Sequence, residues 1–275
     1  MKYHHIKINI NTKNKPSYYT GSMLRGAFGH ALKRVTCINP SYQCKDCFSA
    51  QDCLYYDFYE KENVQHRYRF DIELNSKSYD FGLYLFDDAC SKLPYILSSL
   101  EIALTKNGLG KERTTFNNIQ IKVNDIIVYQ EGGFAGRIDV KTQKIETKKY
   151  TPDLKIKLIT PLRIKKSNHL EYDKIRVEHI LRSIYQRAKY IFDNEEVHSL
   201  DYKPTYTTSV KVFDYKPLYR KSDRQKEQLV MAGVLGEMAV LGLDKRSYEL
   251  LQIGEVLGVG KQTTFGMGKI KIEEV

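Results

Sequence analysis

The most specific stretch of this sequence lies near its C-terminus and reads GVGKQTTFGMG over residues 258–268. Two Gly-apolar-Gly pairs stand on either side of Lys261. The stretch does not fit a Walker phosphate-binding loop, because position 255 is Glu and the residue after the lysine is Gln. It does not fit a dinucleotide-binding fingerprint either, since a helix and not a strand is expected before it. One glycine would suffice to end a helix. Four glycines predict a loop whose backbone passes close to a ligand and turns its N–H groups toward phosphate oxygens.

The patterns around this loop predict one supersecondary unit. Residues 247–257 have the apolar spacing of a helix, and residues 270–272 alternate as a strand. Further upstream we expect strands at 154–158, 209–215 and 228–242 and a helix over 174–194. The resulting order, β-α-β-β-α-β, is that of the ferredoxin-like fold.

The N-terminal half repeats this order. We expect strands at 4–10, 68–74, 79–86 and 119–123, with helices over 20–35 and 89–106. The sequence therefore predicts an α+β chain of tandem ferredoxin-like domains. The expected limits are 1–125 for the first domain, with a cysteine-bearing insertion at 37–53, then a hairpin and linker over 126–152, and 153–275 for the second domain.

The composition is that of a folded, basic chain. Of 275 residues, 44 are Lys or Arg and 33 are Asp or Glu, which gives a net charge of +11, and 41% are hydrophobic. This apolar content excludes disorder as the main state. The longest apolar-looking stretch, residues 229–243, is too short to cross about 30 Å of hydrocarbon. No apolar signal segment follows Met1, so we expect a cytoplasmic protein without a membrane partner. The 21 Tyr residues and the positive charge suit a nucleic acid, although Tyr is also common in strands.

Four of the five cysteines form a cluster, at Cys37, Cys44, Cys47 and Cys53. Disulfides are not expected in the cytoplasm, and a C-x2-C pair lets two thiolates reach one metal ion from the same side. Four thiolates suit a structural zinc ion, with an iron–sulfur cluster as the second choice. The plainer alternative is a set of free thiols in an irregular surface loop.

Several of these stretches resemble a known family. Residues 258–268 resemble the Gly-apolar-Gly-x5-Gly-apolar-Gly signature of the RAMP superfamily of CRISPR proteins. The best match within it is the family of standalone CRISPR repeat-cleaving endoribonucleases, which mature precursor crRNA. Three further stretches are similar to that family: the basic residues 220–226 followed by Gly233 and Gly236, the helix and loop at 250–261, and LRGAFG at 24–29 with the following cysteines, Tyr55 and Phe58.

The resemblance implies a tandem ferredoxin-like fold and an RNA-cleaving activity without a metal cofactor. In the implied reaction, a 2′-hydroxyl attacks the adjacent phosphorus and leaves a 2′,3′-cyclic phosphate and a 5′-hydroxyl. The reaction needs a base, an acid and a cation beside the phosphorane. The implied partner is CRISPR repeat RNA or crRNA, with a CRISPR effector complex as a further one. Two alternatives remain: a non-catalytic RAMP subunit that binds crRNA in such a complex, and a zinc-stapled interaction protein without an RNA role. Monomer and homodimer stay open.

The resemblance also indicates catalytic candidates. In much of the family the catalytic histidine lies on or just after the first helix, and His30 matches that position most nearly. Imidazole titrates near neutrality, so it can act as base or acid. Lys33 lies three residues further on the same side of the helix, and Tyr19 lies just before the helix. His30 lies off the apolar stripe of Leu24, Phe28 and Leu32, so we expect it to face solvent. A plain surface histidine would occupy the same position. His179 is the second candidate and His5 the third.

The RNA-contact candidates lie in the second half of the chain. They are Gly258, Gly260, Lys261, Gly266, Gly268, Arg220, Arg224 and Lys226. The three basic residues before the loop end a stretch, residues 202–226, in which Tyr alternates with Lys and Arg. Such side chains stack on bases and hold phosphates. A solvated strand edge would have a similar composition.

Overall fold

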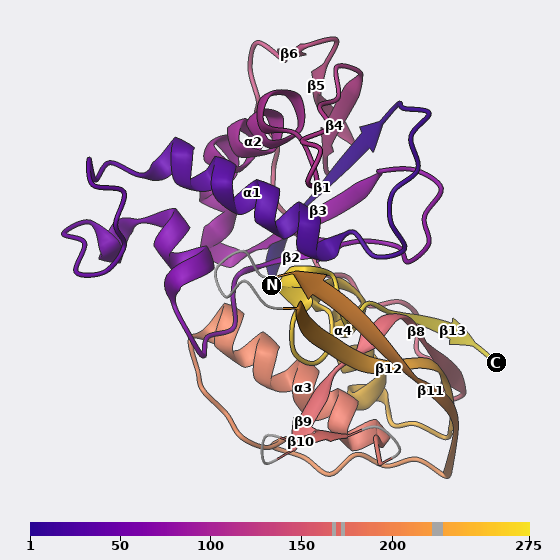
Figure 1. Cartoon of the computed structure of the whole chain (residues 1–275). Helices are drawn as coiled ribbons and strands as arrows, with labels where there is room; N and C mark the ends of the chain where they lie inside the picture. The colour runs from indigo at the N-terminus through magenta and orange to yellow at the C-terminus, as the bar shows by residue number, and fades with distance from the viewer. Residues whose placement is uncertain (167–168, 172–173, 222–227) are drawn as a thin grey trace. The chain divides into compact units, whose positions relative to one another are not determined.

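The computed structural model describes residues 1–166, 169–171, 174–221 and 228–275. They form two compact units, Met1–Lys144 and Ile145–Val275. Each unit has its own hydrophobic core around its own main sheet (Figure 1). No helix in the described part of the chain is long and apolar enough to cross a membrane.

The first unit is built on an antiparallel sheet. Its strands are β1 (Lys2–Ile10), β2 (Tyr68–Asp71), β3 (Phe81–Phe86), β4 (Ile119–Val123), β5 (Ile126–Gln130), β6 (Gly133–Phe134) and β7 (Gln143–Lys144). They are ordered β2-β3-β1-β4-β5-β6, and β7 pairs with β1. On the central strand β1, His4 and the isoleucines at 6, 8 and 10 are buried, and the residues between them face the other side of the sheet.

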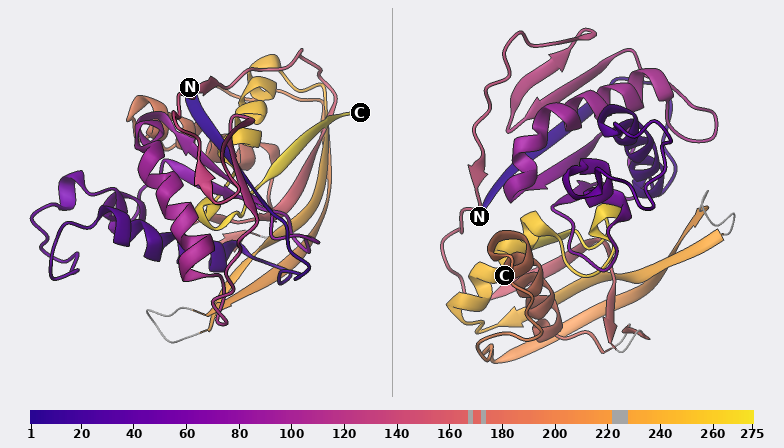
Figure 2. Two further views of the ribbon diagram at one scale, coloured as in Figure 1. Left: turned by 90° about the horizontal axis from the view of Figure 1, so that it is seen from above. Right: turned by 90° about the vertical axis from the view of Figure 1, so that its left-hand side faces the viewer.

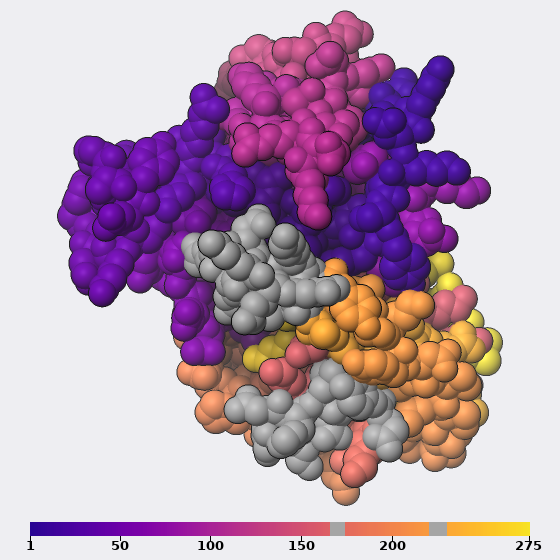
Figure 3. Space-filling model, in the orientation of Figure 1, coloured from indigo at the N-terminus to yellow at the C-terminus, as the bar shows by residue number. Residues whose placement is uncertain are grey.

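Two helices, α1 (Gly21–Thr36) and α2 (Leu93–Ile102), cover one face of this sheet (Figure 2). α1 buries Leu24, Phe28 and Leu32, which are spaced four residues apart and share a core with the isoleucines of β1. The short helical segments of this unit are η1 (Ala50–Asp52), η2 (Tyr56–Glu60), η3 (Asp87–Lys92) and η4 (Ala103–Asn107). The cysteine-bearing segment between α1 and β2 bulges outward from the first unit, as its purple atoms show (Figure 3).

A two-residue turn extends the first sheet beyond the four strands of the motif. Asn124 and Asp125 have φ angles of 50° and 67°, the left-handed values that a tight hairpin turn requires. The turn returns the chain into β5, so Val123 pairs with Ile126. We expected residues 126–152 to form a hairpin and linker. In the structure, residues 126–144 belong to the first unit, and the boundary lies at Lys144.

The second unit has the same plan. Its main sheet contains β8 (Leu154–Leu162), β11 (Thr208–Lys221), β12 (Gln228–Leu241) and β13 (Ile270–Glu274), ordered β11-β12-β8-β13. β9 (Ile164–Lys166) and β10 (His169–Glu171) form a separate two-stranded sheet. The helices are α3 (Val177–Ala188) and α4 (Lys245–Leu257), with short segments η5 (Lys189–Asp193) and η6 (Thr263–Phe265). In both units the motif strands lie in the order second, third, first, fourth, so the prediction of tandem ferredoxin-like domains is confirmed.

Candidate active-site and RNA-contact residues

The exposed face of α1 carries His30 and Lys33. His30 is exposed, while Leu24, Phe28 and Leu32 on the opposite stripe are buried. Lys33 lies one turn further, and its Nζ is 5.0 Å from the centre of the Tyr55 ring. α1 contains no acidic residue, and its other cations are Arg25 and Arg34. An imidazole and a cation on one helix can exchange a proton and hold a phosphate, which are two tasks of an RNA-cleaving site.

Tyr19 lies at the other end of the same helix. It precedes α1, is half-buried and packs against the core of the first unit. The nine-residue step from Gly21 to His30 corresponds to about 14 Å along the helix axis. Tyr19 and His30 therefore lie more than two turns apart along α1, and a catalytic role of Tyr19 stays a prediction.

A tyrosine of η2, Tyr59, contacts α1. The hydroxyl of Tyr59 donates to the backbone oxygen of Arg25 at 2.6 Å, and the Arg25 guanidinium lies 4.3 Å from the centre of the same ring. Tyr55 stacks on Tyr59 with 5.2 Å between ring centres. Burial raises the pKa of Tyr59 well above its usual value, so its hydroxyl stays protonated and acts as a fixed donor. Tyr55 and Phe58 belong to the stretch that resembles the family, whereas the sequence did not indicate Tyr59.

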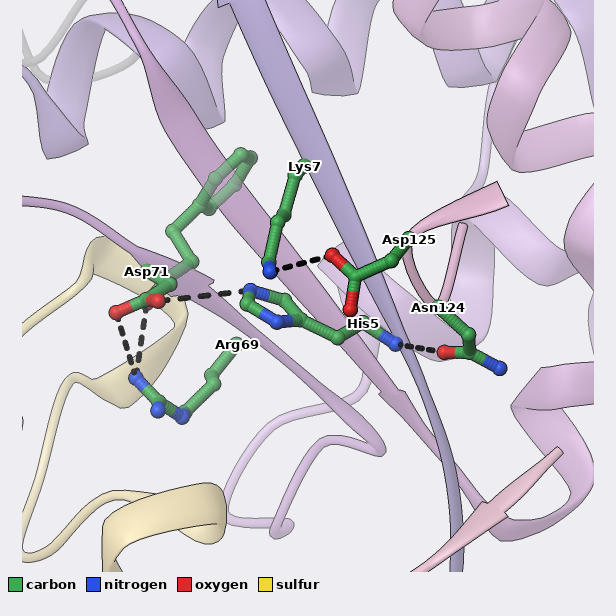
Figure 4. A network of polar contacts seen from close by, with 7 residues as sticks. His5, Lys7, Arg69, Asp71, Asn124 and Asp125 are labelled. Atoms are coloured by element: carbon green, nitrogen blue, oxygen red, sulfur yellow. Dashed lines mark hydrogen bonds and ion pairs between the residues drawn. The ribbon is translucent and has the colours of Figure 1, made fainter. Parts of the chain in front are cut away.

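A second polar cluster lies on the sheet face that α1 and α2 leave uncovered (Figure 4). His5 on β1 stacks on Tyr84 of β3 with 4.0 Å between ring centres, and Arg69 on β2 lies 4.4 Å from the Tyr84 ring centre. Asp71 joins the two ends of the cluster. Its carboxylate is 3.6 Å from His5 Nε2 and 3.7 Å from Arg69 Nη1. The cluster thus holds an imidazole, a carboxylate and a guanidinium around one tyrosine.

A glycine makes the diagonal contact between His5 and Asp71 possible. Gly82 on β3 pairs with Lys7 on one side and Asp71 on the other. A Cβ atom at Gly82 would lie 2.8 Å from His5 Nε2 and 3.0 Å from Asp71 Cβ. Any side chain there would push the two groups apart.

His5 is held as a neutral imidazole. Its side chain is only 18% exposed, and burial lowers its pKa, although Asp71 acts in the opposite direction. Its backbone N–H donates to Asn124 Oδ1 at 2.9 Å, and the neighbouring Lys7 Nζ pairs with Asp125 at 2.7 Å. In the described part of the chain, His5 Nε2 makes no hydrogen bond. The third histidine candidate thus lies beside a carboxylate, Asp71, that the sequence did not indicate.

His179 has a structural task. It is the third residue of α3, and its Nδ1 accepts a hydrogen bond from the backbone N–H of Arg176 at 3.4 Å. This contact satisfies a backbone donor at the start of the helix. His179, the second catalytic candidate, is thus hydrogen-bonded at the start of α3 in the second unit.

The glycine-rich loop is held together by its own backbone. Val259 donates to the oxygen of Gly268 at 2.8 Å, and Gly268 donates to Pro161 at 3.0 Å. The N–H of Gly260 goes to Ser183 Oγ at 2.8 Å, and that of Lys261 to the oxygen of Arg163 at 2.8 Å. The remaining two glycines, Gly258 and Gly266, also donate within the second unit, to Gly254 and Thr263.

This pattern corrects the mechanism that the sequence suggested for the loop. We expected glycine N–H groups turned toward phosphate oxygens, but all four donate to protein atoms. The glycines are needed for a different reason. Gly268 has a φ of 71°, and a Cβ on it would overlap the backbone oxygen of Val259. The loop is therefore a tight scaffold that presents the exposed Lys261 at its tip.

The basic stretch before the loop is only partly described. Arg224 and Lys226 lie outside the described residues, and for Arg220 only the backbone, paired with Leu229 in the hairpin, is described. Tyr215 and Tyr219 on β11 are 49% and 60% exposed. Other members of the stretch are used inside the unit: the Tyr206 hydroxyl bonds Glu178 at 3.0 Å, and Lys211 Nζ donates to the oxygen of Ile175 at 2.8 Å.

The four clustered cysteines do not form a metal-binding group in this arrangement. All are free and partly exposed, and among the described residues no three His, Cys, Asp or Glu side chains are placed to hold one metal ion. Asn39 lies between two of them, since Cys37 Sγ contacts its oxygen at 3.7 Å and its Nδ2 contacts Cys47 Sγ at 3.5 Å. The described arrangement thus does not fit zinc or an iron–sulfur cluster, and both stay predictions.

Comparisons with known proteins match both parts of the chain. Residues 156–270 match the family model of the CRISPR-associated endoribonuclease Cas6, and residues 1–143 match the model AF_1859_N, described as an N-terminal domain. An uncharacterized protein of Archaeoglobus fulgidus is 26% identical over 281 residues, which cover 92% of this chain and 91% of that protein.

The fold is also that of solved Cas6 structures. Thermus thermophilus Cas6 (TTHB231) has a TM-score of 0.54 at 13% identity, with 99% of this chain and 98% of that one covered. A product complex of Cas6 (TTHB231) has a TM-score of 0.58 at 13% identity, with 99% of both chains covered. A structure described as a RAMP protein binding different RNA substrates has a TM-score of 0.51 at 13% identity, with 100% of both chains covered. The second unit therefore matches the family of CRISPR-associated Cas6 endoribonucleases over residues 156–270, and the tandem ferredoxin-like fold of the two units is similar to that of solved Cas6 proteins.

Proposed function

We propose that this protein cuts CRISPR repeat RNA without a metal ion, and that His30 and Lys33 perform the chemistry. The observation that carries the assignment is the exposed face of α1, where an imidazole and a cation lie one turn apart on a helix without acidic residues. A polyanion meets no like charge on that helix.

The proposed reaction is a transesterification within the RNA. A base removes the proton of the 2′-hydroxyl, O2′ bonds to the adjacent phosphorus, and the bond from phosphorus to O5′ breaks. The leaving O5′ takes a proton from an acid. The products are a 2′,3′-cyclic phosphate and a 5′-hydroxyl, so no water and no redox partner is consumed.

His30 supplies the proton transfer and Lys33 the positive charge. An imidazole ring has one nitrogen that can accept a proton and one that can donate, so His30 can take the 2′-hydroxyl proton or return one to O5′. The ammonium of Lys33 stabilises the charge that develops on the phosphorane oxygens. Lys261 at the tip of the glycine-rich loop holds a phosphate elsewhere on the RNA, and Tyr19 contacts another nucleotide.

The test uses a labelled CRISPR repeat RNA, incubated with the full chain in EDTA. A second RNA carries one 2′-deoxyribose at the cut site. We compare His30→Ala with His198→Ala, a loss of an exposed histidine in the second unit. A single cut should survive EDTA and His198→Ala, stop with the 2′-deoxy RNA, and fall by about 100-fold or more in His30→Ala.

Two other outcomes would redirect the assignment. Full cutting by His30→Ala would keep the assignment as an RNA-cleaving enzyme but would reject His30 as its catalytic residue. His5→Ala would then be the next variant to test. Tight binding without any cut would favour the alternative function, a crRNA-binding RAMP subunit of an effector complex.

A further inference from the structure

Two glycines of α1, Gly26 and Gly29, differ in burial and in the space around them. Gly29 is buried, and a Cβ atom on it would lie 2.7 Å from Cζ of the Tyr59 ring. Its lack of a side chain lets η2 pack against the helix. Gly26 is exposed, and a Cβ atom there would meet nothing within 4 Å.

Nothing in the described fold explains a glycine at position 26. The residue lies in the interior of a 16-residue helix and has no positive φ, so any L-amino acid fits its backbone. Glycine is a poor helix former, and alanine at such a position stabilises a helix. Gly26 therefore lowers the stability of the helix at a position where the described residues leave room for a side chain.

The position of Gly26 relates it to the proposed catalytic residue. His30 lies four residues further, directly above Gly26 on the same face. Because helical side chains lean toward the N-terminus, the His30 imidazole leans over the surface that a side chain at 26 would fill. The nearest charged residues of α1, Arg25, Lys33 and Arg34, are all cationic.

We propose that Gly26 is a positioning residue for RNA: its missing side chain lets a ribose–phosphate unit next to the scissile phosphate lie against the α1 backbone beneath His30. This inference rests on the proposed function, because it gives the RNA a place beside the catalytic imidazole. The ligand class is a sugar–phosphate backbone, since a polyanion suits the cationic helix and a base-sized pocket is not needed.

The test separates stability from RNA binding. Gly26→Ala should raise the melting temperature by about 2–4 °C, because it removes a helix-interior glycine. The same variant should weaken binding of the 2′-deoxy repeat RNA, and the longer Gly26→Gln should weaken it at least tenfold. Gly136→Gln is the matched control. Gly136 is also exposed, with no positive φ and nothing within 4 Å of its Cβ position, so its substitution should leave RNA affinity unchanged.

Each result bears on a separate claim. Wild-type RNA affinity in Gly26→Gln, with a folded protein, overturns the inference even if His30→Ala abolishes cutting. Lost affinity in Gly26→Gln with full cutting by His30→Ala keeps RNA on this face and rejects His30 as the catalytic residue. Gly29→Ala provides the internal contrast, since overlap with Tyr59 should lower the melting temperature rather than raise it.

Discussion

Replacing Gly268 with Ala tests whether the glycine-rich loop is a scaffold or a direct RNA contact. Gly268 has a φ of 71°, and a left-handed conformation costs an L-residue about 1–2 kcal/mol. The new Cβ would also overlap the backbone oxygen of Val259. To relieve this overlap, the loop must lengthen the Val259–Gly268 bond of 2.8 Å or the Gly268–Pro161 bond of 3.0 Å.

These two effects give the expected size of the change. A lost backbone hydrogen bond costs about 0.5–1.5 kcal/mol, so strain and one or two lost bonds together lower the free energy of unfolding by roughly 2–4 kcal/mol. At about 2–4 °C for each kcal/mol, the melting temperature of the second unit should fall by roughly 5–15 °C. Gly136→Ala, at an exposed position with open space, should leave it nearly unchanged.

Thermal unfolding followed by circular dichroism, with RNA affinity measured well below the transition, is the appropriate assay. An unchanged melting temperature in Gly268→Ala would refute the scaffold interpretation. If the same variant also lost RNA affinity, the glycine itself would have to contact the RNA. That result would restore the role that the sequence first suggested for the loop.

Three further predictions concern charge and thiols. Lys261→Ala should weaken RNA binding and reduce the slope of log affinity against log salt by about one, and an unchanged slope would remove Lys261 from the contacts. A thiol reagent should modify the four clustered cysteines quickly and Cys90 slowly, because burial raises the pKa of Cys90 to about 12. If the four clustered cysteines react only after a chelator is added, that result would instead support the zinc prediction. Burial lowers the pKa of His4 and His5 below 6.5, so protons favour the unfolded chain and stability should fall as pH drops below about 6.5. Melting at pH 5 and 7.5 should show a smaller difference in His4→Gln than in the wild type, and an equal difference would contradict this assignment.

Local sequence patterns were sufficient to predict the architecture and the side of α1 on which His30 lies. Apolar alternation and helical spacing are local properties, so they can be recognised in the sequence without knowledge of packing partners. They predicted the two β-α-β-β-α-β units and placed His30 opposite Leu24 and Phe28. The glycine spacing of residues 258–268 is also a local pattern, and it indicated the family.

The roles of the glycines and of the other histidines depend on tertiary contacts. The bonds that close the glycine-rich loop come from Pro161, Arg163 and Ser183, which lie 77 to 107 residues away in the sequence from the loop residues they bond. His5 meets Asp71 only because β1, β3 and β2 pair in one register with Gly82 between the two groups. Local periodicity specifies which face a residue occupies. It does not specify the register that sets which distant residue it faces, and that register decides the roles of these side chains.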